Sequence, residues 1–138
     1  MPEDTEITAR RDTVGTWTVS NAFGAELRIG APGEEGAFSP GELLQAALAA
    51  CSVLSADVQL AHHLGADYEA TATVEGVDDE EEGRVAELRA TISPDMSALD
   101  PAEQEKLITR AERVIERLCA IKRSLNHGVE ATAEVRLS

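Results

Sequence analysis

The chain of 138 residues has the length of one domain, and its 43% of apolar residues is enough for a hydrophobic core. Acidic residues outnumber basic residues 26 to 12, and the resulting net charge of −14 repels phosphate backbones and anionic lipid surfaces. Aromatic residues make up only 3%, which leaves little surface for stacking on bases. We therefore expect a single domain over residues 1–138 that binds neither nucleic acid nor membranes.

The cysteines and the N-terminus indicate the cellular compartment. Two cysteines do not make the disulfide framework of a small secreted protein, and residues 1–12 lack the apolar region of a signal peptide. The longest apolar stretch, residues 43–60, is interrupted by polar residues, so we expect no membrane span. We predict a soluble, cytoplasmic protein. Its acid excess is typical of proteins adapted to high salt, although acidic charge also serves ordinary solubility.

Residues 6–30 predict two or three short antiparallel strands, because apolar and polar residues alternate loosely between turn residues. Residues 30–36 form a glycine-rich loop whose spacing matches no nucleotide-binding motif, and two acidic residues stand where a phosphate would lie. We therefore exclude nucleotide binding at this loop.

A long helix is predicted from Ser39 to Leu64. Ser39 can cap it, Pro40 suits the first helical position, Glu42 completes a capping box and Gly65 ends it. Its first half has almost no polar face, which is typical of a buried, central helix.

Two alternating segments follow, residues 68–75 and 85–92, and the acidic residues 78–83 lie between them. Alternation with a period of two predicts strands, so this region is expected to be a long hairpin.

A second long helix is predicted from Asp100 to about Asn126, with an apolar stripe at helical spacing. Residues 129–137 alternate again and predict a last strand. The sequence thus indicates an α+β fold with about six strands and two long helices.

Each predicted long helix carries one cysteine on its apolar face, Cys51 on the first and Cys119 on the second. A free cysteine often packs as a small hydrophobic residue, so both could be core residues. Two packed helices could also bring the sulfurs within disulfide distance, which would suit a peroxide-reducing thiol pair. The sequence leaves both interpretations open.

The segment from Ser39 to Cys51, SPGELLQAALAAC, resembles the signature helix of the OsmC/Ohr family, the osmotically inducible and organic hydroperoxide resistance proteins. The segment from Cys119 to Leu125 is similar to the second-cysteine segment of that family. The resemblance implies an intertwined homodimer with antiparallel sheets wrapped around two long central helices. It also implies reduction of organic hydroperoxides: Cys51 attacks the peroxide, Cys119 forms a disulfide with it, and a dithiol donor reopens the disulfide. It implies no cofactor.

A cation must favour the Cys51 thiolate, because apolar surroundings raise the pKa of a thiol. In the family an Arg of the N-terminal strands does this, held by a Glu of the signature helix. Here Gly41 holds the usual Glu position, Glu42 follows it, and no Arg stands near Trp17. Arg11 shares strand parity with the apolar face, so we expect Arg11 and Glu42 to complete the site. Arg10 and Arg28 are the next candidates.

Other chemistry has little support in the sequence. His62 and His63 are neighbours on a helix and point about 100° apart, so they do not form one metal site. The alternative to a peroxidase is a non-catalytic OsmC-like dimer, for stress response or apolar-ligand binding, in which the cysteines are structural.

Overall fold

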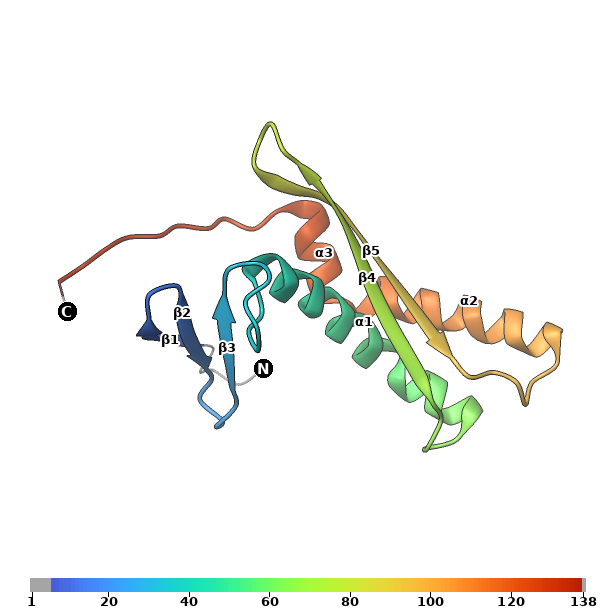
Figure 1. The fold of residues 1–138 in the computed structure, drawn as a ribbon. Coiled ribbons are helices and arrows are strands. Elements are labelled where there is room, and N and C mark those ends of the chain that lie inside the picture. The colour runs from blue at the N-terminus through green and yellow to red at the C-terminus, as the bar shows by residue number, and fades with distance from the viewer. Residues whose placement is uncertain (1–5, 138) are drawn as a thin grey trace. The chain divides into compact units, whose positions relative to one another are not determined.

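The computed structural model describes residues 6–137, whose contacts group into two compact units, Met1–Ala46 and Ala47–Ser138. The boundary between the units falls within a helix, and each unit is described by itself (Figure 1). The elements form an α+β fold with antiparallel sheets, as the sequence predicted. The single domain over residues 1–138 stays a prediction.

The first unit contains a three-stranded antiparallel sheet, in the order β1 (Thr8–Thr13), β2 (Thr16–Ser20) and β3 (Glu26–Gly30). Gly15 has a φ of +83° in the turn between β1 and β2, a conformation that glycine adopts without strain. The prediction of two or three strands in this region is therefore confirmed.

Helix α1 (Pro40–Leu64) begins and ends where the sequence predicted. The Ser39 backbone N–H donates to the Glu42 carboxylate at 2.8 Å, and the Glu42 N–H donates to the Ser39 hydroxyl at 3.2 Å. This reciprocal pair is a capping box. Gly65, with a φ of +101°, ends the helix.

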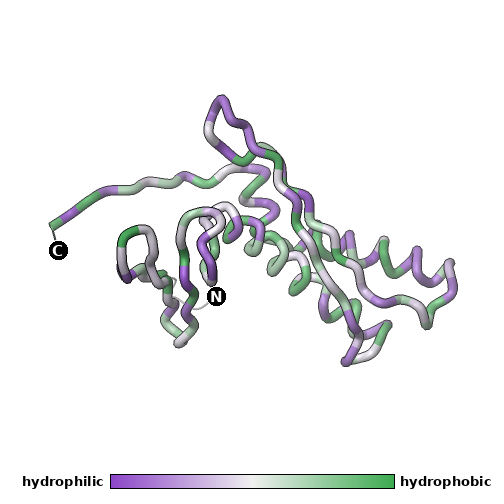
Figure 2. Tube along the Cα trace, viewed as in Figure 1, coloured by the Kyte–Doolittle hydropathy of each residue, from purple (hydrophilic) through white to green (hydrophobic). Residues whose placement is uncertain are grey.

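The predicted hairpin is present in the second unit as β4 (Ala70–Asp79) and β5 (Arg84–Pro94), which pair antiparallel with one shift of register between Val77 and Asp78. Gly83, with a φ of +62°, lies at its tip. The tip is strongly hydrophilic (Figure 2), as the run of acidic residues there requires.

The second long helix differs from the prediction, because it is interrupted at Cys119. Helix α2 (Pro101–Leu118) starts at an Asp100 capping box and stops at Cys119, and α3 (Ala120–His127) restarts at the next residue. Cys119 itself has φ −75° and ψ +96°, an extended conformation. The expected pair of long helices is thus one helix of 25 residues and a segment broken into 18 and 8.

The predicted last strand is absent from the described part of the chain, where residues 128–137 have no regular structure. Residues 6–137 therefore contain five strands, where about six were expected. A strand exists only through hydrogen bonds to a neighbour, and no described strand pairs with this segment. Its alternating apolar residues are left in solvent, with Val135 and Leu137 fully exposed.

The core of the second unit lies where α1 meets α2. Ala56 and Leu60 of α1 pack with Leu107 and Ala111 of α2, and partly buried residues of the two helices and of the connecting segments surround them. By length and hydropathy α1 is the one described helix that could span a membrane, which corrects the expectation that its polar residues rule this out. A core helix passes the same test, so the indication is weak.

Candidate active site

Cys51 lies in the middle of α1, within the second unit, and its side chain is half-buried. The hydroxyl of Ser55, one turn later, donates to the Cys51 carbonyl at 2.7 Å. In the middle of a helix every backbone N–H is already bonded to a carbonyl four residues earlier. Backbone donors for the Cys51 sulfur must therefore come from another part of the chain.

Cys119 lies at the junction of α2 and α3 and is 1% exposed. Its backbone N–H donates to the Ile115 carbonyl at 2.9 Å, which closes α2. Its sulfur accepts the Lys122 N–H at 3.4 Å, which caps the start of α3. One cysteine thus ends one helix and begins the next.

The structure brings the two free cysteines together at the first turn of α3. Burial raises the pKa of Cys51, but it is outweighed by hydrogen bonds from the Ile121 N–H, the Cys119 thiol, the Ala120 N–H and the Ser55 hydroxyl. The net effect is a pKa below the ordinary thiol value. A thiol that titrates low exists more as thiolate, the form that reacts with peroxides and disulfides.

The first N–H groups of a helix have no partner inside that helix. In α3 the N–H groups of Ala120 and Ile121 reach Cys51, and that of Lys122 reaches Cys119. Two sulfurs therefore bond the donors of one helix start, where the helix dipole also favours negative charge. These donors are backbone groups exposed by a helix break, so no side chain in the sequence indicated them.

The other two predicted site residues belong to the first unit. Arg11 lies on β1 opposite Trp17 of β2, and its side chain is exposed. Hydrogen bonds from the Ser39 N–H, and then from its hydroxyl, hold the pKa of Glu42 below the usual value. Glu42 thus has the capping role, while the participation of Arg11 and Glu42 in chemistry stays a prediction.

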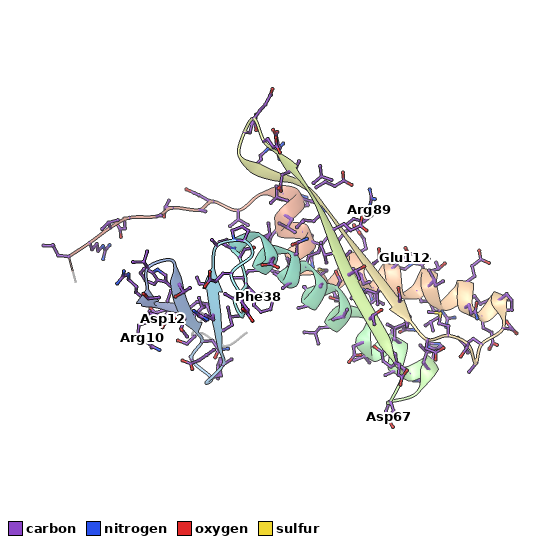
Figure 3. The ribbon with its side chains drawn as sticks, viewed as in Figure 1. Arg10, Asp12, Phe38, Asp67, Arg89 and Glu112 are labelled. Carbon is purple, nitrogen blue, oxygen red and sulfur yellow. The ribbon has the colours of Figure 1, made fainter. Side chains whose placement is uncertain are left out.

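Arg10, the cation next to Arg11 in the sequence, has a carboxylate partner within the first unit. Arg10 and Asp12 both extend from β1 (Figure 3). The Arg10 guanidinium lies 4.0 Å from the Glu26 carboxylate, and Asp12 accepts a hydrogen bond from the Thr18 hydroxyl at 2.7 Å. Arg10 is therefore engaged on the sheet surface, and the choice of Arg11 over Arg10 stays a prediction.

Histidines and acidic residues form no metal-binding group within residues 6–137. His63 instead uses its ring nitrogens for structure: Nδ1 lies 3.0 Å from the Gln59 carbonyl and Nε2 lies 3.1 Å from the Arg110 guanidinium. An Nδ1–H donor and an Nε2 acceptor satisfy both contacts.

Comparison with known proteins identifies the family. The model of the OsmC-like protein family matches residues 33–134, which include both cysteines. The chain belongs to the OsmC-like protein family. Uncharacterized members from Mycobacterium tuberculosis and Mycobacterium bovis are 38% identical to it over 112 residues, which is 81% of this chain and 82% of theirs.

Solved structures of OsmC-like proteins share the fold. A proposed osmotic stress induced and detoxification response protein of Psychrobacter arcticus matches with a TM-score of 0.67 at 22% identity, over 90% of both chains. The organic hydroperoxide resistance protein OhrB of Bacillus subtilis matches with a TM-score of 0.54 at 20% identity, over 86% of this chain and 88% of its own. The family resemblance inferred from residues 39–51 is thereby confirmed.

Proposed function

We propose that this OsmC-like protein is a cytoplasmic, thiol-dependent peroxidase that reduces organic hydroperoxides in oxidative stress defence. The observation that carries the proposal is the pairing of Cys51 and Cys119 at one helix start. A thiol with a lowered pKa and a second free thiol within hydrogen-bond contact are the two parts that such a reaction needs.

In the first step the Cys51 thiolate attacks the outer oxygen of the hydroperoxide. The O–O bond breaks, Cys51 becomes a sulfenic acid, and the alkoxide leaves with a proton as an alcohol. In the second step the Cys119 sulfur attacks the sulfenic sulfur, a disulfide forms and water leaves. A dithiol reductant then exchanges with this disulfide, restores both thiols and is itself oxidised to a disulfide.

The start of α3 serves the first step. The N–H groups of Ala120 and Ile121 favour negative charge on the Cys51 sulfur, which offsets the cost of burying a thiolate. Arg11 would add a full positive charge from the first unit, and one oxygen of Glu42 would orient its guanidinium. No cofactor enters the reaction.

The proposed assembly is a homodimer. Leu54 and Val58 lie one turn apart on α1 and are 71% and 81% exposed, although both are large apolar side chains. Burying two such side chains is worth about 1.5–3 kcal/mol each. A second copy of the chain would cover this face.

The test is a single turnover with one equivalent of cumene hydroperoxide. The wild-type protein should lose two hydrogens in mass spectrometry, Cys119→Ser should trap a sulfenic acid on Cys51, and Cys51→Ser should consume no peroxide. Arg11→Ala should slow consumption, whereas the matched Arg10→Ala should not. The proposal is wrong if both thiols of the wild type remain open to alkylation after the oxidant.

A further inference from the structure

The surface of α2 separates its charges by sign. Lys106, Arg110, Arg113 and Arg117 follow one another at spacings of four, three and four residues, so at about 100° per residue they share one face of the helix. We call these four residues the α2 cationic stripe. Glu105, Glu112 and Glu116 lie about 80–120° away on the other flank.

This separation is unfavourable for an isolated helix. Like charges four residues apart repel, as in the pairs Lys106–Arg110 and Arg113–Arg117, whereas opposite charges at that spacing attract. Acidic residues are common in this chain, which has 26 of them, yet none stands four residues from a cation of the stripe. The stripe therefore concentrates positive charge on one face where helix stability alone would not.

Among the residues that the structure describes, no carboxylate forms an ion pair with a cation of the stripe. Within residues 6–137 the ion pairs involve other cations, namely Arg10, Arg84, Arg89, Lys122 and Arg136. Within the stripe, the Arg110 guanidinium contacts the ring of His63 on α1. That contact is to a ring nitrogen, so the positive charge of Arg110 is not neutralised.

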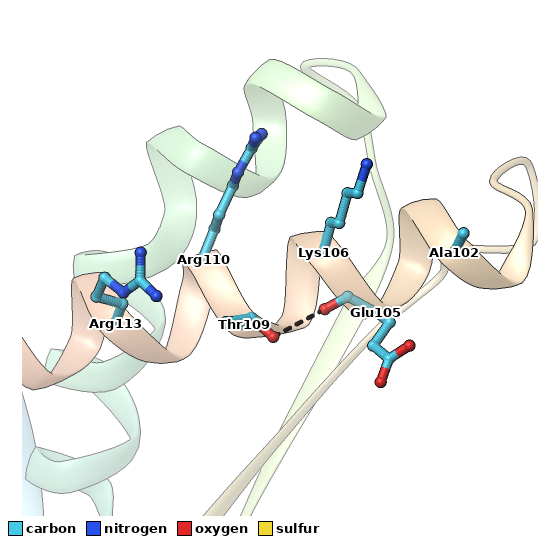
Figure 4. Close-up of a pocket in the computed structure, with 6 residues that line it drawn as sticks. All are labelled: Ala102, Glu105, Lys106, Thr109, Arg110 and Arg113. Carbon is cyan, nitrogen blue, oxygen red and sulfur yellow. Dashed lines mark hydrogen bonds between the residues drawn. The ribbon is translucent and has the colours of Figure 1, made fainter.

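The stripe borders an open groove of about 420 Å³. Ala102, Glu105, Lys106, Thr109, Arg110 and Arg113 line it. Lys106, Arg110 and Arg113 extend to the same side of α2, while the Glu105 carboxylate extends away from them (Figure 4). All six residues belong to α2, so the groove is an open recess along one face of this helix, and three of the side chains that line it carry positive charge.

We propose that this groove binds a small polyanion, one that carries a phosphoryl group or several carboxylates. The guanidinium groups of Arg110 and Arg113 offer pairs of parallel N–H donors that match carboxylate and phosphate oxygens, and Lys106 adds a third charge. Two arginines and a lysine call for more than one negative charge on the ligand. The Thr109 hydroxyl donates to the Glu105 carbonyl at 3.0 Å, so it is already engaged within the helix.

The protein as a whole repels anions, because its net charge is −14. Binding of a small anion would therefore indicate a specific site and not a general attraction. Pyrophosphate and citrate are titrated separately into the full-length protein at 50 mM KCl, by calorimetry and by amide NMR. We expect saturable binding of at least one of them, with shifts concentrated in α2, and a loss of about tenfold or more in affinity in Arg113→Gln. Comparison of the two probes then distinguishes a phosphoryl ligand from a polycarboxylate.

Two controls separate this site from general charge effects and from the cysteines. Arg89→Gln removes the same charge from β5, where Arg89 is paired with Glu87 at 2.8 Å, and should bind as the wild type does. Cys51→Ser should also bind normally, because the groove does not use the sulfur. The inference is overturned if neither anion saturates, or if Arg89→Gln weakens binding as much as Arg113→Gln.

Discussion

Helix α1 and the segment α2–α3 each carry one cysteine, but the backbone is helical at the first cysteine and leaves the helix at the second. In α1 the helix runs unbroken through Cys51 for 25 residues. In the second segment the helix stops at Cys119 and restarts at Ala120. The unbroken helix holds a thiol in place but has no N–H to offer it, whereas the break releases three N–H groups beside both sulfurs.

The difference shows that the thiol with the lowered pKa and the N–H groups that lower it belong to different helices. The environment of Cys51 is set by how α2 and α3 are docked against α1. Substitutions far from the sulfurs can therefore alter the pKa of Cys51 if they loosen that docking.

The largest effect is expected from Leu107→Ala, which removes a side chain 2% exposed from the contact between α1 and α2. A cavity of this kind costs about 2–5 kcal/mol of unfolding free energy. Denaturant unfolding measures it. Ile108→Ala is the matched control, because Ile108 is 47% exposed and its loss should change stability by about 0.5 kcal/mol or less. Equal effects for the two variants would contradict the assigned core.

Removing the sulfur cap should have the next largest effect. Cys119→Ala deletes the acceptor of the Lys122 N–H and should cost about 1 kcal/mol, the usual value of a helix N-cap. Cys119→Ser keeps an acceptor at the same place and should lose little. Thermal unfolding of the two variants in parallel gives the comparison, and identical melting temperatures would show that the sulfur does not cap α3.

The same pair of variants tests the titration of Cys51. Its pKa is lowered in the folded protein, so the bonds that favour the thiolate stabilise the fold above the ordinary thiol pKa, and this contribution is lost as pH falls through the folded value. Alkylation of Cys51 by iodoacetamide should inflect below about 8.5. The inflection should rise in Cys119→Ala and stay closer to the wild type in Cys119→Ser. An unchanged inflection in both would remove Cys119 from the environment of Cys51.

A smaller effect should follow the loss of a hydrogen bond between α1 and the segment that follows it. The Tyr68 hydroxyl donates to the Asp57 carboxylate at 2.5 Å. Burial, and then Asp57, raise the pKa of Tyr68 to about 12. Tyr68→Phe should cost about 0.5–1 kcal/mol, since the bond is partly exposed. Ultraviolet titration of the wild type should show a tyrosine that ionises well above 10 and is absent in the variant.

The smallest effect should come from the ion pair between Glu116 of α2 and Lys122 of α3, which spans the break. Lys122 lowers the pKa of Glu116, yet exposed pairs of this kind contribute little. Glu116→Gln should lower the melting temperature slightly in 0.1 M KCl and not at all in 1 M KCl, where the Debye length is about 3 Å. A loss that persists in 1 M KCl would mean that the pair holds the junction by more than charge.

The elements that the sequence predicted well are those with local signals. Helix α1 was placed correctly because Ser39, Pro40 and Glu42 define its start and Gly65 its end within a few residues of chain. The hairpin β4–β5 was predicted for the same reason, since a period of two and a turn between the strands are both local. The family was likewise predicted from one contiguous stretch, residues 39–51.

The features that the sequence did not predict depend on distant parts of the chain. No glycine or proline marks the break at Cys119, and the apolar spacing continues through it, so the sequence gives no sign of the contacts that its sulfur makes with Cys51 and the Lys122 N–H. Residues 129–137 have the pattern of a strand but no described strand to pair with. Cys51 and Cys119 were predicted as a pair, whereas their backbone donors could not be inferred from side-chain identities.

The position of Cys119 between two helices has a consequence for the energetics of the proposed cycle. A disulfide to Cys51 would close a loop of about 70 residues and restrict the unfolded chain by about 4 kcal/mol. The oxidised protein would then unfold at a higher temperature than the reduced one. By thermodynamic linkage the folded structure would favour its own disulfide by the same amount, so the dithiol that reopens it must be the stronger reductant.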